Sequence, residues 1–410
     1  MDCFFLRKLI RLWPGRIIGH VPKPSPQVLE GCGKCGEVGR LCKSRGFERV
    51  LLVTDSTLFG MGFHRQVVDA LEREHVAYTI FNDISSEPTV GVVDRGRRAA
   101  SQSGAQCVIA LGGGSVMDAC KMMAAGMKLK YLPSSMLLQK LLFVPGGTVP
   151  LIALPTTAGT GAEVSVGAIV KNEDDPTSEN VRERTSGAKC ATVIVGLRVE
   201  YVVLDPDLSM RAPLHVAAKS AIDAMSHGIE GFVADVNVKE ERRHYCVDCV
   251  KLAFANLPRM LASPDNVDAR QALCRAAYYG GNSISNHTAG YVHAFAHTIG
   301  AYYHIDHGTA IALCLIPVLR YQKPYCEQKY AQLAAYCGIV PSSADAFLAA
   351  LERLVAQCGL HVPEICDEDF DALSHLVIKD SINYSAPMVL HKKEVVVLLK
   401  EIQGTRLVNK

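Results

Sequence analysis

The sequence lacks the features that would assign it to a membrane or a nucleic acid. Its formal net charge is only +2 over 410 residues, so electrostatics give no reason to expect a nucleic acid or an anionic membrane as a partner. The most apolar internal stretch, 137–155, contains Lys140 and three prolines, and a helix of this composition cannot span a bilayer. We therefore expect a soluble protein with neither kind of partner.

A secretory signal is also missing. Arg7, Lys8 and Arg11 interrupt the apolar residues at the N-terminus, where a signal peptide needs a continuous apolar region. Residues 1–25 are interpreted as an N-terminal extension, either a weak amphipathic helix or a targeting peptide. The 15 cysteines are odd in number and scattered, unlike the dense framework of a short secreted chain. Reduced thiols and a cytoplasmic location are expected.

Cationic side chains are absent from one long segment that is rich in histidine. No Lys or Arg occurs between Ala276 and Leu319, and five of the 14 histidines lie from His287 to His307. Imidazoles in an apolar segment are either core residues satisfied by hydrogen bonds or ligands that hold something. The residues themselves leave both interpretations open at this point.

The order of apolar runs predicts two parts of different class. Short β-rich runs such as 49–55 and 75–83 alternate with helical patterns from about residue 28 to 206, which is typical of a parallel, doubly wound α/β sheet. Later stretches show 3.6-residue periodicity with few strand signals. We predict an α/β dinucleotide-binding domain over 1–208 and an all-α metal-binding, catalytic domain over 209–410.

Two turns in the first part have the composition of phosphate-binding loops. Glycine lets a backbone approach a ligand closely, and the free N–H groups of a helix start favour a phosphate. The first turn follows the strand QCVIAL, and the second follows VPLIALP. The predicted cofactor-binding residues of these turns are Gly112, Gly113, Gly114, Ser115 and Asp118, followed by Thr156, Thr157 and Thr160.

Asp55 stands at the end of the 49–55 strand and has two interpretations. Its carboxylate can accept a hydrogen bond from a ribose 2′-hydroxyl and would repel a 2′-phosphate, which favours NAD over NADP. It can equally be the N-cap of the helix that follows. The sequence does not decide between the two.

Histidine and carboxylate pairs in the second part have the spacing of metal ligands. Asp223 and His227 stand four residues apart, as do His293 and His297, so each pair shares one helical face. Fe(II), Zn(II) and Mn(II) are borderline ions, and a site of imidazole and carboxylate ligands suits them better than a site of soft thiolates. For a single histidine core packing is the better interpretation, but two pairs plus His307 favour a metal.

Four motifs together resemble the iron-containing alcohol dehydrogenase family. They are GGGSVMDACK, PTTAGTGAEVS, DAMSHGIEGFV and VHAFAHTIGAYYHIDHG. The resemblance covers the chain from about residue 28 onward. It implies a Rossmann-like domain followed by a helical domain, as in the dehydroquinate synthase-like fold, with the active site in the cleft between them. It also implies a divalent metal, Fe²⁺ in preference to Zn²⁺, held by Asp223, His227, His293 and His307.

The resemblance assigns further residues and shows departures from the family pattern. It places His297 near the nicotinamide as a catalytic, non-ligand residue and Lys189 near the cofactor ribose, whereas His304 is interpreted as structural or at a pocket edge. Ala162 replaces a usual serine, and Asp306 replaces a usual proline. Asp306 is therefore expected to orient His307 through a hydrogen bond.

The expected function is a metal- and NAD-dependent alcohol dehydrogenase or aldehyde reductase. The cation-free segment, with Phe295 and Tyr302 in its apolar wall, favours a small neutral primary alcohol or diol as substrate. A homo-oligomer, dimeric or larger, is expected. The alternatives are a dehydroquinate synthase-like lyase, which would bind its anionic substrate with several cations, a glycerol dehydrogenase, and a hydroxyacid–oxoacid transhydrogenase. A metal-storage protein would leave the two nucleotide-type turns unexplained.

Overall fold

The structure is a computed structural model that divides the chain into two compact units. It describes residues 20–84, 87–173, 188–235, 240–360, 365–381 and 384–405. The sheet unit comprises Pro22–Thr157 and Gly161–Ala212, and the helical unit comprises Met1–Val21, Ala158–Thr160 and Pro213–Lys410. Most of the N-terminal extension predicted over 1–25 lies outside the described residues.

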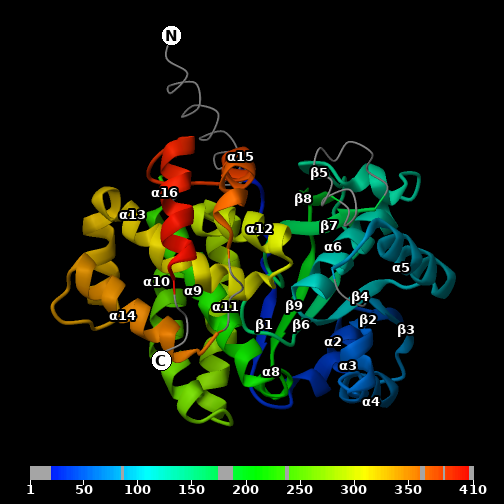
Figure 1. Ribbon diagram of the computed structural model, residues 1–410. Helices are drawn as coiled ribbons and strands as arrows, with labels where there is room; N and C mark the ends of the chain where they lie inside the picture. The colour runs from blue at the N-terminus through cyan, green and yellow to red at the C-terminus, as the bar shows by residue number, and fades with distance from the viewer. Residues whose placement is uncertain are drawn as a thin grey trace. The chain divides into compact units, whose positions relative to one another are not determined.

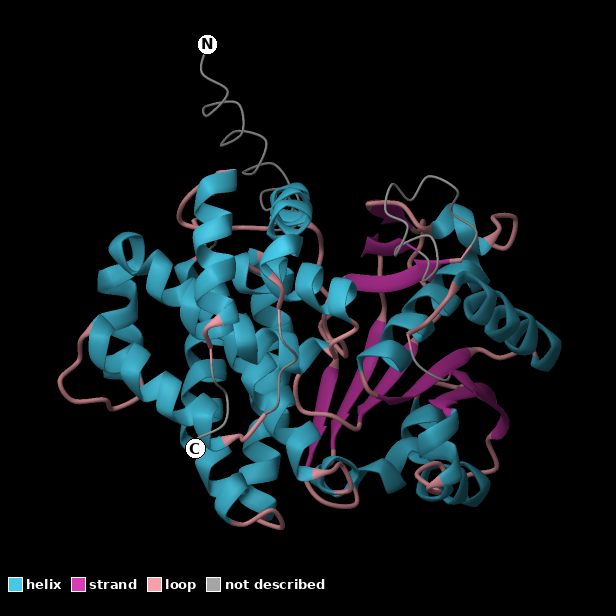
Figure 2. Cartoon of the chain, viewed as in Figure 1, coloured by secondary structure: helices cyan, strands magenta, loops and turns pink. Residues whose placement is uncertain are grey.

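A parallel six-stranded sheet forms the centre of the sheet unit (Figures 1 and 2). Its strands are β1 (Gln27–Glu30), β2 (Arg49–Asp55), β3 (Ala77–Ile84), β4 (Cys107–Gly112), β6 (Leu151–Pro155) and β9 (Val199–Leu204). They lie in the order β1-β9-β6-β4-β2-β3, and every neighbouring pair is parallel. The carboxyl ends of β4 and β6 therefore meet at one edge of the sheet.

Helices cover both faces of this sheet because its central strands are apolar on both faces. The helices of the unit are α2 (Val38–Ser44), α3 (Ser56–Gly60), α4 (Arg65–Arg73), α5 (Val90–Ser103), α6 (Gly114–Lys128) and α8 (Pro206–Met210), with the 3₁₀ turns η1 (Lys34–Glu37) and η2 (Ser134–Leu137). Val50 and Leu52 of β2 pack in one core with Leu71 of α4. Residues alternate between faces in a strand, so Leu51 and Val53 lie on the face that α5 and α6 cover.

A second, smaller sheet accompanies the first. It consists of β5 (Leu141–Phe143), β8 (Ala188–Val195) and β7 (Gly167–Asn172), in that order, with β5 parallel and β7 antiparallel to β8. The sequence patterns did not predict these three strands or β1. β5 is only three residues long, and β7 (GAIVKN) and β8 (AKCATVIV) have neither a regular alternation of apolar and polar residues nor a continuous apolar run over their whole length.

The described part of the helical unit contains helices and turns but no strand. Its helices are α9 (Leu214–Val233), α10 (Arg243–Ala262), α11 (Val267–His287), α12 (Tyr291–Tyr303), α13 (His307–Tyr336), α14 (Ala344–Gln357), α15 (Phe370–Ser381) and α16 (Lys392–Gln403), with the 3₁₀ turns η3 (Glu240–Arg242) and η4 (Asp367–Asp369). The predicted fold class, a parallel α/β domain followed by an all-helical one, is confirmed. None of the described helices combines the length and apolarity needed to cross a bilayer.

Helix α9 is the central element of this unit and is buried over most of its length. It contacts α10, α11 and α13. Gly228 and Gly231 allow this close packing, since a Cβ at residue 228 would lie 2.9 Å from the Cys246 carbonyl oxygen and one at residue 231 would collide with Ser283. A helix surrounded in this way holds its side chains in fixed positions.

Candidate metal centre and cofactor-binding loops

Three side chains from three helices of the helical unit converge on one point. Asp223 comes from the middle of α9, His293 from the first turn of α12, and His307 is the first residue of α13. One ligand atom of each lies within 4.8 Å of those of the other two. Asp223 Oδ1 is 3.6 Å from His293 Nε2 and 3.3 Å from His307 Nε2.

His227, the fourth predicted ligand, lies at the edge of this cluster. It follows Asp223 by one helical turn, and its Nε2 is 3.6 Å from Asp223 Oδ1. Its ring stacks on His293 with 4.7 Å between centroids. It is nevertheless outside the set of mutually close ligand atoms. The structure therefore brings all four residues together but draws only three into a tight group.

The bonding state of the cluster fits a cation. Asp223 Oδ1, His293 Nε2 and His227 Nδ1 are buried without a hydrogen-bond partner among the described residues. Buried polar atoms almost always have a partner, and a divalent ion would provide one for Oδ1 and for Nε2. One carboxylate with imidazoles is a donor set that Fe(II) and Zn(II) favour. The His307 side chain is 39% exposed, so this side of the cluster is accessible to a small molecule.

Glu230 orients His293 from behind. Its Oε2 lies 2.5 Å from His293 Nδ1, and its Oε1 accepts a hydrogen bond of 2.6 Å from the Val292 N–H. The carboxylate therefore holds the ring with Nε2 directed into the cluster, which is how outer-shell carboxylates fix metal-binding histidines. Sequence reasoning missed Glu230, although it lies in DAMSHGIEGFV two helical turns after Asp223 on the same face.

Neighbouring charges shift the pKa values in the cluster strongly. Burial raises the pKa of the Asp223 carboxyl, but the electrostatic interactions with the His227 and His307 imidazoles outweigh burial and hold it well below its usual range. Burial lowers the pKa of His227 to about 4. Burial also lowers that of His293, yet the Glu230 and Asp223 carboxylates reverse the direction and raise it to about 9. Asp223 is therefore an ionised carboxylate, and His227 a neutral imidazole, at neutral pH.

The remaining residues of α12 have different surroundings. His297 lies one turn after His293, its ring 5.0 Å from that of His307, and its Nδ1 shares a hydrogen bond of 2.6 Å with the Tyr384 hydroxyl. His304 ends the helix with a positive φ of 56° and is exposed, in keeping with a structural role. The predicted apolar wall needs a correction, because Phe295 has no exposed surface and belongs to the core.

The two predicted phosphate turns lie side by side in the sheet unit. The Thr156 N–H donates to the Gly112 carbonyl at 3.1 Å, and a Cβ at residue 113 would lie 3.3 Å from Thr157 Oγ1. The first helical bond of α6 runs from Met117 N to the Gly113 carbonyl. The preceding N–H groups, from Gly114 to Val116, therefore have no helical partner and can bind an anion.

Other predicted cofactor residues bond within the protein. Asp55 caps α3, its Oδ1 accepting from the Leu58 N–H at 2.8 Å, so the N-cap interpretation describes this structure. Asp118 accepts from Lys121 Nζ at 3.0 Å and from the Ile169 N–H at 2.9 Å. Thr160 belongs to the helical unit. Lys189 is part of β8, but its side chain lies outside the described part of the structure. Contact of these residues with a cofactor stays a prediction.

Family profiles match most of the chain. The profile described as iron-containing alcohol dehydrogenase covers residues 25–195, and that of the C-terminal part of the Fe-containing alcohol dehydrogenase family covers residues 217–403. The chain belongs to the iron-containing alcohol dehydrogenase family. The fold, the oxidoreductase class and a divalent metal with NAD as cofactors are those of this family, as the sequence motifs predicted.

The names of several relatives of this iron-type dehydrogenase describe alcohol dehydrogenases or an aldehyde reductase. Lactaldehyde reductase of Escherichia coli K12 is 28% identical over 362 residues, which are 85% of this chain and 91% of that protein. Alcohol dehydrogenase 4 of Schizosaccharomyces pombe is 26% identical over 393 residues, covering 91% and 86% of the two chains. The structure of an alcohol dehydrogenase from Oenococcus oeni superposes with a TM-score of 0.81 at 25% identity, covering 93% of this chain and 99% of the other.

The residue that departs from the family pattern before His307 is also explained by the structure. Asp306 caps α13 by accepting from the Thr309 N–H at 3.1 Å, and it pairs with Lys219 Nζ at 2.9 Å. The expected hydrogen bond to His307 is not among the contacts of the described residues. Asp306 thus fixes the start of the helix whose first residue is His307, rather than the imidazole itself.

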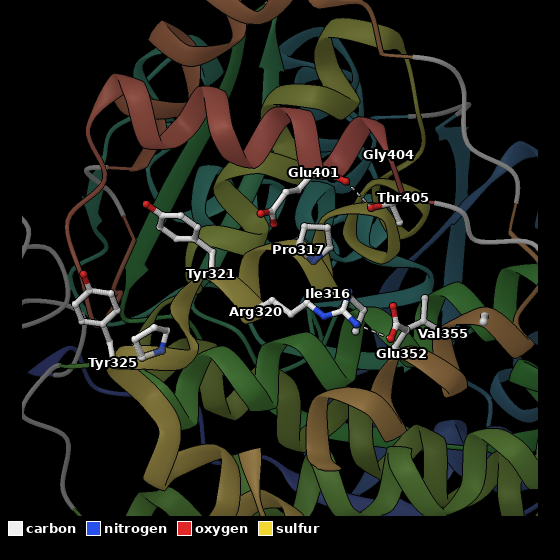
Figure 3. Close-up of a pocket in the computed structure, with 12 residues that line it drawn as sticks. Ile316, Pro317, Arg320, Tyr321, Tyr325, Glu352, Val355, Glu401, Gly404 and Thr405 are labelled. Atoms are coloured by element: carbon white, nitrogen blue, oxygen red, sulfur yellow. Dashed lines mark hydrogen bonds and ion pairs between the residues drawn. The ribbon is translucent and has the colours of Figure 1, made fainter. Parts of the chain in front are cut away.

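A cavity of about 930 Å³ elsewhere in the helical unit contains none of the candidate residues (Figure 3). It is lined by parts of α13, α14 and α16, among them Tyr321, Tyr325 and Glu401. Arg320 in its wall pairs with Glu352 at 2.6 Å, so its charge is already compensated. Nothing in this cavity indicates a reactive site, whereas the buried polar atoms without a partner around Asp223 make that cluster the candidate.

Proposed function

We propose that this dehydrogenase interconverts a small, neutral primary alcohol or diol and the corresponding aldehyde in the cytoplasm. Asp223, His227, His293 and His307 are its metal ligands, with Fe²⁺ favoured over Zn²⁺. The single observation that supports this best is the buried group of Asp223 and His293, because Asp223 Oδ1 and His293 Nε2 have no hydrogen-bond partner in the described part of the chain. We further propose a homo-oligomer and a functional division at residue 208 into a dinucleotide-binding and a metal-binding domain.

Each side chain has a distinct task in this proposal. When bound, a divalent ion supplies Lewis-acid chemistry at the alcohol or aldehyde oxygen, and NAD supplies the acceptor or donor of the hydride. Asp223 contributes the negative charge of the ligand set, and His293 would offer Nε2 to the ion, with its ring held in place by Glu230. His297, with its ring beside that of His307, is placed to move a proton or to contact the nicotinamide.

The cofactor residues are proposed from the sheet unit. The N–H groups at the start of α6 and the hydroxyls of Thr156 and Thr157 would hold the pyrophosphate. Support comes from the adjacency of the two turns through the Thr156–Gly112 hydrogen bond. The remaining proposed cofactor contacts are Asp55, Asp118, Thr160 and Lys189. NAD is preferred to NADP because the Asp55 carboxylate would repel a 2′-phosphate.

One experiment tests the metal site and the reaction together. The protein is purified anaerobically, its metal content is measured, and NAD(H) absorbance is followed with short alcohols, diols, aldehydes, glycerol and hydroxyacids. His293→Ala and His307→Ala should lose both metal and turnover. His304→Asn is the matched control, because Asn tolerates the positive φ of this helix end. Full turnover by a metal-free His293→Ala protein would contradict the proposal.

A further inference from the structure

His297 is connected to a tyrosine and a carboxylate from a later part of the chain. Its Nδ1 shares a hydrogen bond of 2.6 Å with the Tyr384 hydroxyl. The Asp380 carboxylate is nearby, since its Oδ2 lies 4.0 Å from His297 Nδ1. A phenol and a carboxylate therefore both lie beside Nδ1 of the imidazole.

The segment that carries Tyr384 is anchored at the start of α12. The Ser385 N–H donates to Thr288 Oγ1 and to the Ala289 carbonyl, each at 3.0 Å. The Tyr291 hydroxyl donates to the Met388 carbonyl at 2.7 Å. These bonds anchor the residues that follow Tyr384, and the Tyr384 N–H itself donates to the Ser381 carbonyl at 3.3 Å. The contact with His297 is thus part of a fixed arrangement rather than the chance position of one side chain.

The nearby carboxylate favours one direction for the bond between His297 and Tyr384. Asp380 Oδ2 lies 4.0 Å from His297 Nδ1, and a negative charge at this side of the ring stabilises an N–H there relative to a lone pair. Burial, followed by the charge of Asp380, raises the pKa of Tyr384 above its ordinary value, so the phenol stays neutral and its oxygen can accept a hydrogen bond. The bond is accordingly one in which His297 Nδ1 donates to the Tyr384 oxygen.

We propose that Tyr384 and Asp380 are positioning residues that hold His297 in the Nδ1–H tautomer. Nδ1 donates to the Tyr384 oxygen, and Nε2 keeps its lone pair. The imidazole then presents an acceptor on the side away from Tyr384, as a proton-handling histidine needs when its other nitrogen is oriented by a carboxylate. The importance of this tautomer for turnover rests on the proposed function, whereas the tautomer itself does not.

Histidine side-chain NMR tests the tautomer directly. Long-range ¹H–¹⁵N spectra of protein labelled at histidine distinguish an Nδ1–H from an Nε2–H ring, and the spectrum of His297→Asn identifies the His297 signals. Wild-type protein should show His297 as Nδ1–H. Tyr384→Phe should shift it toward Nε2–H, and Asp380→Asn should shift it in the same direction because the negative charge that favours a hydrogen on Nδ1 is lost.

Tyr303→Phe provides a matched control for the loss of a partly buried hydrogen bond. Tyr303 lies on α12 and donates to Asp369 Oδ2 at 2.6 Å, the same distance as the contact of Tyr384 with His297. Both variants should lower thermal stability similarly, but only Tyr384→Phe should change the His297 spectrum. With a substrate found in the alcohol and aldehyde screen, Tyr384→Phe should lower kcat by up to about 100-fold and leave KM little changed. A factor of about 100 is the lower end of what a positioned proton-transfer group contributes to the rate.

The outcomes separate the two proposals. An unchanged His297 tautomer in both Tyr384→Phe and Asp380→Asn, or an Nε2–H ring in the wild type, overturns the positioning role. A kcat of Tyr384→Phe equal to that of Tyr303→Phe overturns its importance for turnover. If the wild type turns over no alcohol or aldehyde, the proposed function fails, but the spectra still decide the tautomer. Should Tyr384→Phe not fold, Asp380→Asn carries the same test.

Discussion

Glu163 allows a prediction whose magnitude follows from the structure. This residue of the second nucleotide turn is buried at 2% exposure, and its Oε1 has no hydrogen-bond partner among the described residues. Burial raises the pKa of its carboxyl from 4.5 to about 7, only partly offset by the charge of Lys121. The folded chain therefore binds a proton at Glu163 more tightly than the unfolded chain does.

The sign and size of the effect follow from proton linkage. Below pH 4.5 the carboxyl is protonated in both states, and its contribution to stability is fully present. As the pH rises toward 7, the unfolded chain releases the proton first, so stability falls; above pH 7 the loss is complete. At 1.36 kcal/mol per pH unit, the total loss is about 3 kcal/mol. Glu163→Gln cannot ionise and should not show this loss.

The assay is urea unfolding of the full chain at pH 5.5 and pH 8.5, followed by circular dichroism. The stability of Glu163→Gln relative to wild type should increase by about 2 kcal/mol between these two pH values. Glu48→Gln, which changes an exposed glutamate of the same unit, should show no such increase. A wild type that gains stability over Glu163→Gln at pH 8.5 would refute the reasoning, because Glu163 would then be an ionised partner of Lys121.

Three further predictions concern the metal centre. Glu230→Gln should weaken binding of Zn²⁺, measured by isothermal titration, by about 10- to 100-fold because His293 loses its orienting carboxylate, and unchanged affinity would contradict the role of Glu230. Gly290→Ala places a Cβ 2.6 Å from Glu230 Oε1, so affinity should fall in the same assay while the thermal midpoint changes little. Asp306→Asn keeps a good helix cap but leaves the Lys219 ammonium without its carboxylate. The ratio of kcat/KM for a hydroxyacid to kcat/KM for a neutral alcohol should therefore rise. An unchanged ratio would argue against a position of Lys219 near the substrate.

Local sequence patterns predicted the main sheet and the helices well, because the evidence for them is local. The strand predicted over 49–55 coincides with β2, and the apolar run before Gly113 is β4. Helical periodicity in the second half, together with its few strand signals, predicted the all-helical unit. The short strands β5, β7 and β8 were missed because strands of three to eight residues with partly exposed faces leave little pattern.

The candidate site was predicted less completely, since its outer residues have no spacing rule. Asp223 and His227 share a helical face, which the sequence shows. Glu230 lies on the same face of α9 as Asp223, but an acidic residue on a helix is ordinarily exposed to solvent. Only the structure, in which Glu230 is 2% exposed, distinguishes it from such surface residues. Tyr384 follows His297 by 87 residues, and no local pattern joins two positions so far apart.

The charge balance around His307 refines the case for a neutral substrate. The absence of Lys and Arg between Ala276 and Leu319 is a property of one segment, whereas a substrate meets side chains from several. The structure adds Lys219 of α9, which packs against Gly308 beside His307. Its ammonium is paired with Asp306 at 2.9 Å, the residue that departs from the family pattern. An anionic substrate would have to compete with that carboxylate for Lys219, whereas a neutral alcohol would not. The Lys219–Asp306 pair therefore favours a neutral substrate, as the segment without Lys or Arg does.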